Sequence, residues 1–498
     1  MAKAIEDLNR GELEEVARAQ QDEIAELKSW NEQLTAHVAQ LSARVEQLTG
    51  QVDQLQRELS RARKDSNTSA KPPSSDITNG PKSRGAGKGS TKRSSNRRKG
   101  GQPGHEKHDR EPFAADAIDH HLSHTLDQCP ACGGDVTLSD NAPRSQQQIE
   151  LIDRPVYEVT EHAAYAYWCD SCQQMHQAPM PADAEAGGLF GPKLTAWVGY
   201  LKGACHCSYS TIQELLRDVI GICVSQGFLV KVIDRASQSL APVHQALGQA
   251  LPEQEQVNAD ETGHKDEGQR MWSWCFRAEA FTWFHIDPTR SAQVLWDTLG
   301  EDFAGVLGCD YFSAYRKYMG ECDIRVQFCL AHLIRDLRYL TTLNDEATQT
   351  YGNTLVKRVG RLFELIHQRE TMGEREFETE MIKARDAILK RALTRVPETA
   401  EAQNIAKRFR DHGETYFRFI TTPGIEPTNN LAEQAIRFVV IDRRVTQGTR
   451  GERGQRWCER IWTLIATCRQ QGRSIYQTLT DAVHAHFHSL PSPQLALT

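Results

Sequence analysis

Three acidic residues that lie far apart in the sequence each adjoin a predicted element of secondary structure. Asp260 closes a short apolar run and precedes a turn predicted at Gly263, and Asp310 closes a second apolar run. Glu433 lies in the first turn of a predicted amphipathic helix. Carboxylate oxygens suit Mg²⁺ or Mn²⁺, and two such ions held close together can activate one oxygen while stabilising another in an in-line phosphoryl displacement. The pattern predicts a two-metal site for polynucleotidyl transfer.

The elements around these carboxylates follow from hydrophobic periodicity and turn residues. In order they are a strand at 257–260, hairpin strands at 271–277 and 281–286, a helix at 291–299, strands at 305–309 and 324–328, and a helix at 330–340. Three antiparallel strands, a helix and two more strands, with carboxylates at the ends of the first and fourth strands, is the order of an RNase H-like fold. The charged, helical stretch from 341 to about 419 has no strand pattern, and we interpret it as an insertion before Glu433.

Each carboxylate taken alone also has a purely structural explanation. Asp260 and Asp310 would serve as strand-end caps, and Glu433 follows Asn430 at the spacing of a capping box. The joint placement of the three residues on one predicted core favours the metal site. Glu261 and Asp323 are nearby substitutes, but side chains alternate along a strand, so Glu261 is expected on the face opposite Asp260.

The sequence leaves the role of two groups of cysteine and histidine residues open. Cys329 and His332 lie at helical i, i+3 spacing and would pair either as metal ligands or in core packing near the edge of the site, with packing favoured. Cys205, His206 and Cys207 are adjacent in sequence. Adjacent residues rarely converge on one ion, so packing is favoured there too.

Two Cys-x-x-Cys pairs predict a structural zinc site. Cys129 and Cys132 are followed, after a long gap, by Cys169 and Cys172. Four thiolates complete a tetrahedral shell around Zn²⁺ with no open position, so the site has no catalytic role. Alternating residues at 148–168 predict hairpin strands between the pairs, which favours a zinc ribbon that binds DNA or docks another domain.

Leucines recur every seven residues near the N-terminus, as at position d of a heptad repeat. They are Leu27, Leu34, Leu41, Leu48 and Leu55. Position a then falls on Ile24, Asn31, Val38, Val45, Val52 and Leu59. β-Branched residues at a with leucine at d favour a parallel two-stranded coiled coil, and a buried polar residue such as Asn31 specifies its register. The repeat predicts a homodimer or higher oligomer; the alternative is a long helix that packs on its own chain.

A basic segment follows this repeat. Between Lys71 and Gly104 there are nine Lys or Arg residues and one Asp. The segment contains too few apolar residues to offset the entropy of ordering, so we expect a disordered linker. Such an arm adds sequence-independent, salt-sensitive affinity for DNA through phosphate contacts, although a solubilising tether is the alternative. Its candidate DNA-binding residues are Arg93, Arg97, Arg98 and Lys99.

Length and composition bound the remaining possibilities. A chain of 498 residues with 39% hydrophobic content should form several domains with real cores. The sequence lacks an apolar run of about 18 residues and an evident export signal, so we expect a soluble, cytoplasmic protein with reduced thiols and no membrane partner. The net charge of −7 is an average that conceals the segregated basic segment.

The predicted organisation is a multidomain combination of α+β and α/β parts. It comprises a coiled coil (1–64), a disordered basic linker (65–112), a zinc ribbon (113–182), a helical module (183–252), the first part of the core (253–340), a helical insertion (341–423), the Glu433-bearing core helix (424–445) and a C-terminal helical tail (446–498). The helical module would either contact DNA as a helix-turn-helix or only pack. The two interpretations are equally supported.

Taken in order, the motifs resemble those of transposases of the insertion sequence 66 family. They are the heptad leucines, an arm with GGQPGH, the CPAC and CDSC pairs, Asp-Glu-Thr at 260–262, Cys-Asp-Tyr at 309–311, Cys-Leu-Ala-His at 329–332 and NNLAEQAIR at 429–437. The resemblance extends over nearly the whole chain and implies a DDE active site at Asp260, Asp310 and Glu433. In the third motif the family usually has AERAIRP and then Lys-Asn-Trp, whereas Gln434 and the stretch 443–446 stand in these places here.

The expected function is DNA transposition, with cleavage at the ends of the element and strand transfer into target DNA. Mg²⁺ or Mn²⁺ would be catalytic and Zn²⁺ structural. The expected partners are transposon-end and target DNA in the nucleoid, a second copy of the chain and accessory proteins of the same element. Phosphates near the metals would be held by Arg437, Arg443 and Arg444. The alternatives are a domesticated, non-catalytic DNA-binding protein and a stand-alone metal-dependent nuclease.

Overall fold

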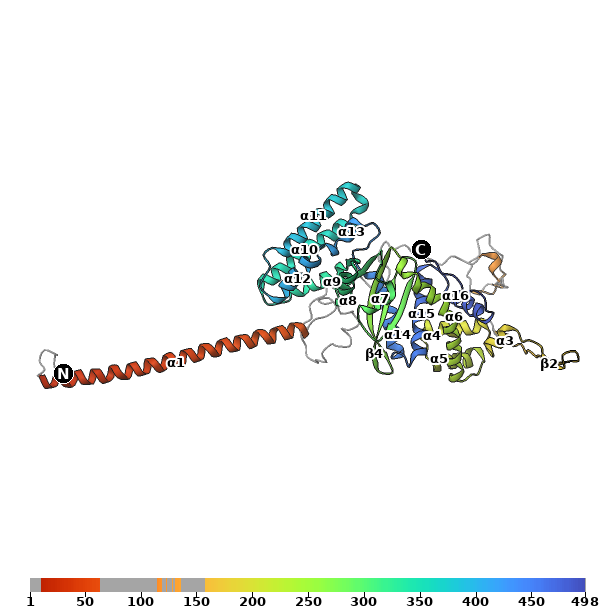
Figure 1. Cartoon of the computed structure of the whole chain (residues 1–498), viewed down its shortest axis with the longest axis horizontal. Coiled ribbons are helices and arrows are strands. Elements are labelled where there is room, and N and C mark those ends of the chain that lie inside the picture. The colour runs from red at the N-terminus through yellow and green to blue at the C-terminus, as the bar shows by residue number, and fades with distance from the viewer. Residues whose placement is uncertain are drawn as a thin grey trace. The chain divides into compact units, whose positions relative to one another are not determined.

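The computed structural model describes residues 10–62, 114–118, 122, 128, 130–135 and 157–497. Contacts divide the chain into two compact units, and the larger unit contains the central sheet and most of the helices (Figure 1). A mixed sheet among many helices confirms the predicted combination of α and β structure. In the described part of the chain, no helix is both long enough and apolar enough to cross a lipid bilayer.

The central sheet has five strands in the order β5-β4-β3-β6-β7. They are β3 (Gln256–Asp266), β4 (Gln269–Arg277), β5 (Thr282–Asp287), β6 (Val306–Cys309) and β7 (Arg325–Phe328). The first three pair antiparallel, and β6 pairs parallel to both β3 and β7. Parallel neighbours need a crossover, and α7 (Gln293–Leu299) and α8 (Ser313–Cys322) lie in the two connections. The predicted strand sequence is therefore confirmed.

The predicted end of the first strand is wrong. Strand β3 continues past Asp260 and Gly263 to Asp266, because it pairs with β4 residue by residue. The turn lies instead at Glu267 and Gly268, which have φ values of +48° and +85° and match the two-residue hairpin turn that suits twisted strands. On its other side, β3 pairs with β6 only as far as Asn258. Asp260 thus lies within a strand, just beyond the end of its parallel partner.

Helices from both sides of the sheet sequence pack into one bundle. They are α4 (Pro192–Gly203), α6 (Gln226–Gln249), α15 (Glu452–Gln470) and α16 (Ile475–Phe487), with the shorter α3 (Ala182–Gly187) and α5 (Tyr209–Leu215) alongside. The packing is close: a Cβ atom on Gly203 would lie 2.3 Å from Cγ1 of Ile461. The helices before the sheet and the C-terminal helices therefore pack directly against one another.

Helix α15 also supplies hydrogen-bond acceptors to the edge strand β5. Three side chains spaced four residues apart accept from alternate backbone amides of the strand. The pairs are Thr282 N with Thr467 Oγ1 at 3.2 Å, Phe284 N with Thr463 Oγ1 at 3.0 Å and Ile286 N with Glu459 Oε1 at 2.7 Å. Four helical residues advance about 6 Å and two strand residues about 6.7 Å, so the two series stay in step. The helix thereby closes this edge of the sheet against further strand pairing.

The segment between the last strand and the Glu433 helix is helical throughout (Figure 1). It follows α9 (Leu330–Leu340) and comprises α10 (Glu346–His367), α11 (Glu374–Leu393), α12 (Ala400–His412) and α13 (Arg418–Thr421). Helix α10 packs on both α9 and α11. The chain then enters α14 (Asn430–Thr446), which packs on β3 and β4. The predicted helical character of the insertion is confirmed.

The N-terminal repeat forms one continuous helix, α1 (Arg10–Ala62). Its described heptad residues at positions a and d are exposed: the apolar ones from Ile24 to Leu55 each expose between 46% and 68% of their surface. A long helix with an open apolar seam has the form that a coiled-coil partner would cover.

A small hairpin lies between α1 and the central sheet in sequence. Its strand β1 (Ala166–Cys169) pairs antiparallel with β2 (Gln174–Gln177).

Candidate active site

The three predicted carboxylates come from β3, the end of β6 and the first turn of α14. Burial raises the pKa of Asp260 well above its usual value, and the charges of Glu261, Asp310 and Glu433 raise it further. Burial and the charge of Glu261 likewise raise the pKa of Asp310 to about 7, although its carboxylate accepts a hydrogen bond from Phe312 N. The fold therefore gathers negative charge where it is costly without a cation.

Two buried asparagines connect the start of α14 to the strand that carries Asp260. Asn429 donates from Nδ2 to the carbonyl of Ala259 at 2.7 Å, and Asn258 donates to Asn429 Oδ1 at 2.9 Å. Asn258 and Asn429 are 3% and 2% exposed. Because these bonds join the neighbours of Asp260 to the first turn of α14, they set the position of Glu433 relative to β3.

These asparagines were not among the predicted site residues. The available signal was a polar Asn258 in an otherwise apolar strand start and a pair of asparagines before the Glu433 helix. The capping-box explanation for Glu433 is not supported, because the residue at the helix cap, Asn429, makes no side-chain capping bond. Its side chain is committed to β3 instead.

Glu261 lies beside this cluster but is bound by residues outside it. It is 9% exposed and accepts hydrogen bonds from the hydroxyl of Tyr315 and the guanidinium of Arg290. The Arg290 Nε bond measures 2.7 Å. The adjacent acidic residue therefore already has a counter-charge, and its role is to hold α8 and the loop after β5 against β3.

Glu433 contacts α9 in addition to lying near β3. Its Oε2 is 3.3 Å from Nη2 of Arg335, and its Oε1 is 3.5 Å from Nδ1 of His332. The thiol of Cys329 lies in the same place and accepts a hydrogen bond from Asn429 N at 3.1 Å. Burial lowers the pKa of His332 and raises that of Cys329 to about 11. The predicted Cys329 and His332 pair is thus buried against the Glu433 side chain rather than against apolar core alone.

The profile of the transposase IS66 family matches residues 187–456, more than half of the chain. This chain belongs to that family. The matched region contains the sheet, the helical insertion and all of α14, so the three carboxylates lie within it. A second profile, of a family of unknown function, matches residues 14–111.

Two curated relatives of this IS66 family member come from Sinorhizobium fredii (strain NBRC 101917 / NGR234). The uncharacterized protein y4qI is 26% identical over 337 residues, which cover 61% of this chain and 62% of the relative. The uncharacterized protein y4hP is 24% identical over 378 residues, covering 68% of this chain and 67% of the relative. The chain therefore spans about three fifths of the length of the first relative. Their names state no activity, so the family profile is the comparison that informs function.

The arginines predicted to hold phosphates lie along α14 of the family-matched region. Arg437 and Arg444 are exposed, whereas Arg443 is half-buried and donates to Thr262 Oγ1 at 3.2 Å. Arg443 thus links α14 to the residue two positions after Asp260. The predicted contacts at Arg93, Arg97, Arg98 and Lys99 lie outside the described residues.

The predicted zinc site is described for three of its four cysteines, since Cys129 lies outside the described residues. In both pairs, the residue after the second cysteine is left-handed: Gly133 has a φ of +71° and Gln173 a φ of +50°. Backbone amides of Cys172 and Ser171 lower the pKa of Cys169, which favours its thiolate. His176 Nε2 lies 3.1 Å from Cys172 Sγ, an additional contact that the cysteine pattern did not predict.

The Cys205-His206-Cys207 segment has a packing role. His206 adopts a left-handed backbone with a φ of +57°, and its Nδ1 lies 2.8 Å from Oδ1 of the buried Asp442 on α14. Trp462 of α15 donates to the other oxygen of Asp442 at 2.9 Å. Within the described parts of the chain, the groups of three residues placed to share an ion are Cys169, Cys172 and His176, and Cys329, His332 and Glu433. His206 instead joins the loop after α4 to α14.

Proposed function

We propose that this chain is a DDE-type DNA transposase with an RNase H-like core. Asp260, Asp310 and Glu433 would hold Mg²⁺ or Mn²⁺, and the reaction would be cleavage at the ends of the element followed by strand transfer into target DNA. Membership of the IS66 transposase family supports the general role. The strand order β5-β4-β3-β6-β7, with a helix-borne glutamate after an insertion, supports the core assignment.

The placement of three carboxylates by β3, the end of β6 and the first turn of α14 is the observation that carries this proposal, and the raised pKa of Asp260 agrees with it. Burial and three neighbouring carboxylates each disfavour its ionised form. Oxygen donors that repel one another in a low-dielectric setting match what a hard divalent cation needs. When bound, such cations would neutralise this charge and promote the activation of the attacking oxygen. The donor set therefore fits Mg²⁺ or Mn²⁺.

The residues of the chain would hold and orient the DNA around this donor set. In cleavage, a water oxygen attacks the phosphodiester, the bond from phosphorus to the 3′ oxygen breaks, and a free 3′-OH is produced. In joining, that 3′-OH attacks a phosphodiester of target DNA and releases a second 3′-OH. Asp260 and Glu433 would keep their relative positions through both steps because the Asn258 and Asn429 bonds connect β3 to α14. No covalent intermediate with the protein is required.

The other segments would serve binding and assembly. The arginines of α14 and the basic arm would contact phosphates, which fix position and orientation without reading sequence. Zn²⁺ held by Cys129, Cys132, Cys169 and Cys172 would be structural. Helix α1 would join two copies so that two active sites act on the two ends of the element.

The decisive experiment replaces each carboxylate separately. Asp260→Ala, Asp310→Ala and Glu433→Ala are expected to abolish cleavage and strand transfer while end-DNA binding persists, because phosphate docking does not need the metal-bound charge. Oligonucleotide cleavage, strand transfer and gel-shift assays measure the three quantities. Full strand transfer by any one variant would refute the assignment. Cleavage without joining in the unmodified protein would favour a nuclease, and DNA binding without either step would favour a non-catalytic DNA-binding protein.

A further inference from the structure

Cys329, His332 and Glu433 bring a thiol, an imidazole and a carboxylate together beside the proposed active site. One ligand atom from each residue lies within 4.8 Å of the other two. Cys329 and His332 are 2% and 7% exposed. Cys329 occupies the position just before α9, His332 lies in the first turn of that helix, and Glu433 lies in the first turn of α14. Neither Asp260 nor Asp310 belongs to this group.

Two atoms in this cluster have unmet bonding capacity. His332 Nδ1 and Glu433 Oε1 are buried, lack a hydrogen-bond partner and lie 3.5 Å apart. Buried polar atoms without partners are rare in folded proteins, and each one calls for an explanation. Nitrogen and oxygen ligands about 2.1 Å from a tetrahedral zinc ion lie roughly 3.4 Å from each other. The observed separation matches the spacing of two ligands of one ion.

The donor set also indicates which ion would bind. A sulfur, a nitrogen and an oxygen donor suit a borderline-soft divalent ion such as Zn²⁺, whereas Mg²⁺ takes oxygen ligands. We propose that Cys329, His332 and Glu433 form a second divalent-metal site, selective for ions of the zinc class, which competes with the Asp260 and Asp310 pair for Glu433. The competition rests on the proposed transposase function; the binding itself does not.

Arg335 sets the affinity of this site. Its Nη2 lies 3.3 Å from Glu433 Oε2, and its Nη1 donates to His332 Nε2 at 3.3 Å. When Nδ1 of a neutral imidazole binds a metal, its proton is on Nε2, which then cannot accept from arginine. The hydrogen bond from Arg335 to Nε2 and the binding of an ion at Nδ1 therefore exclude one another. Removing the guanidinium should increase metal affinity, whereas removing any of the three ligands should decrease it.

The test uses the full-length protein preloaded with one equivalent of Zn²⁺ and then titrated with Co²⁺. Unmodified protein should bind Co²⁺ with a thiolate-to-cobalt absorption band in the near ultraviolet, a band that the oxygen donors Asp260 and Asp310 cannot produce. Cys329→Ser should lose the band. His332→Asn and Glu433→Gln should weaken Co²⁺ binding by more than the roughly 10–100-fold that the loss of an outer-shell partner costs. Arg335→Gln should bind Co²⁺ more tightly than the unmodified protein.

Matched controls keep this test informative. Cys468→Ser replaces another buried cysteine, on α15, and should keep the band. Asp260→Asn and Asp310→Asn should also keep it, because neither residue is a ligand of the proposed site. Circular dichroism establishes that each variant is folded, and His332→Asn leaves the thiol in place should Cys329→Ser fail to fold. A band that persists in folded His332→Asn and Cys329→Ser, or no uptake of Co²⁺ beyond the preloaded zinc, would overturn the proposal.

A second measurement separates the site from the proposed reaction. In Mg²⁺-dependent cleavage, added Zn²⁺ should inhibit the unmodified protein at lower concentration than Cys329→Ser, because only the former can withdraw Glu433 through the thiolate site. If Zn²⁺ inhibited the unmodified protein and Cys329→Ser equally, the proposed competition for Glu433 would be wrong. The Co²⁺ titration would still decide whether the three residues bind a metal ion. If Asp260→Ala remained active in strand transfer, the proposed function would fail, but the Co²⁺ band would be unaffected.

Discussion

Helix α1 and the core around Asp260 create their interaction surfaces in different ways. In α1, the residues that would meet a partner repeat every seven positions along 53 residues of one helix and are exposed. In the core, Asn258 and Asn429 are 171 positions apart and meet in the interior. The surface of α1 is complete within one local segment and requires a second molecule to cover it. The surface around Asp260 forms only after the whole sheet and its insertion have folded.

This difference predicts that the two regions fail independently. The N-terminal seam should be removable without damage to the core, because its apolar residues are exposed in the single chain. The active site should respond to changes far away in sequence, because its geometry depends on long-range hydrogen bonds.

The largest effect is expected from charging the seam. Replacing Leu34, Leu41 and Leu48 together with Glu places like charges across a dimer interface and should abolish dimerisation and paired-end complexes, with single-end binding retained. Light scattering and gel-shift assays measure these. Replacing Glu26, Glu32 and Glu46, which lie away from the seam on the same helix, with Gln is the control and should leave the dimer intact. An unchanged oligomer in the leucine variant would move the dimer contact to the core.

Replacing Asp310 is expected to stabilise the folded protein. Because its folded-state pKa is raised to about 7, the contribution of this carboxyl to stability is fully present below about pH 4 and is lost as pH rises through 7. Asp310→Asn should therefore be more stable than the unmodified protein by roughly 2–4 kcal/mol at pH 8 without divalent ions, and equal to it near pH 4. Urea unfolding at the two pH values checks this.

The exposed Asp323 at the end of α8 offers a matched control for that measurement. Asp323→Asn should not change the pH dependence of unfolding. Millimolar Mg²⁺ should raise the unfolding midpoint of the unmodified protein and leave that of Asp310→Asn unchanged, since ligand binding stabilises only the state that binds it. A destabilised Asp310→Asn at pH 8 would contradict the interpretation of this site as a cluster of unneutralised charge.

A smaller loss is expected from separating α14 from β3. Asn429→Ala removes one donor and one acceptor from a buried network and should cost about 2–3 kcal/mol, because the carbonyl of Ala259 and the amide of Asn258 lose their partner. Cleavage should fall further than stability alone explains, since Glu433 loses its fixed position. The neighbouring Asn430 is exposed, so Asn430→Ala is the control and should change stability by less than about 0.5 kcal/mol. Equal activity in the two variants would contradict the positioning role.

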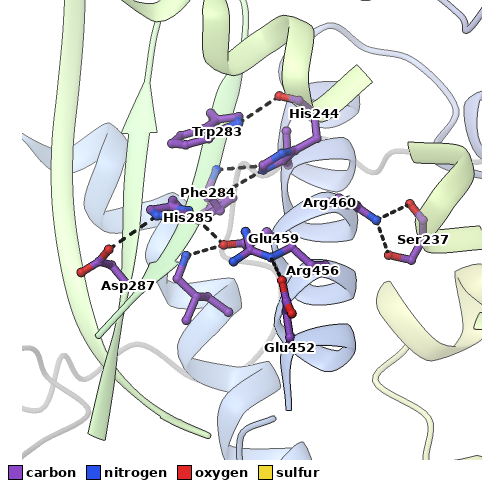
Figure 2. A network of polar contacts seen from close by, with 12 residues as sticks. Ser237, His244, Trp283, Phe284, His285, Asp287, Glu452, Arg456, Glu459 and Arg460 are labelled. Atoms are coloured by element: carbon purple, nitrogen blue, oxygen red, sulfur yellow. Dashed lines mark hydrogen bonds and ion pairs between the residues drawn. The ribbon is translucent and has the colours of Figure 1, made fainter. Parts of the chain in front are cut away.

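The smallest effect is expected at Glu459, which closes the edge strand (Figure 2). Burial alone would raise the pKa of Glu459, but His285, Arg456 and the amide of Ile286 together hold it below its usual value. Its contribution to stability is therefore present above about pH 4.3 and lost as pH falls through the lowered pKa. Glu459→Gln should cost about 1–2 kcal/mol at pH 7 and should remove part of the acid-dependent loss. Unfolding curves from pH 7 to pH 3 measure this, and unchanged acid sensitivity would contradict it.

The sequence by itself determined the elements whose signals are local. The seven-residue repeat predicted the helix of α1, hydrophobic alternation and turn residues predicted the five core strands in order, and the absence of alternation predicted the helical insertion. Alternation also predicted that Glu261 lies on the face of β3 opposite Asp260, and in the structure its carboxylate accepts a hydrogen bond from Tyr315 of α8.

Tertiary structure alone decided the features that depend on a partner distant in sequence. Strand β3 extends past Asp260 because β4 pairs with it, although Gly263 and its polar neighbours resemble a turn when taken alone. Asn429 bonds to β3 rather than capping its own helix, and Glu433 meets His332 and Arg335 of α9. Local conformational propensity has a smaller effect on the free energy than a buried hydrogen bond or an extra strand pairing. The hydrogen bond and the strand pairing each depend on two distant segments, so the residues of one segment alone do not predict them.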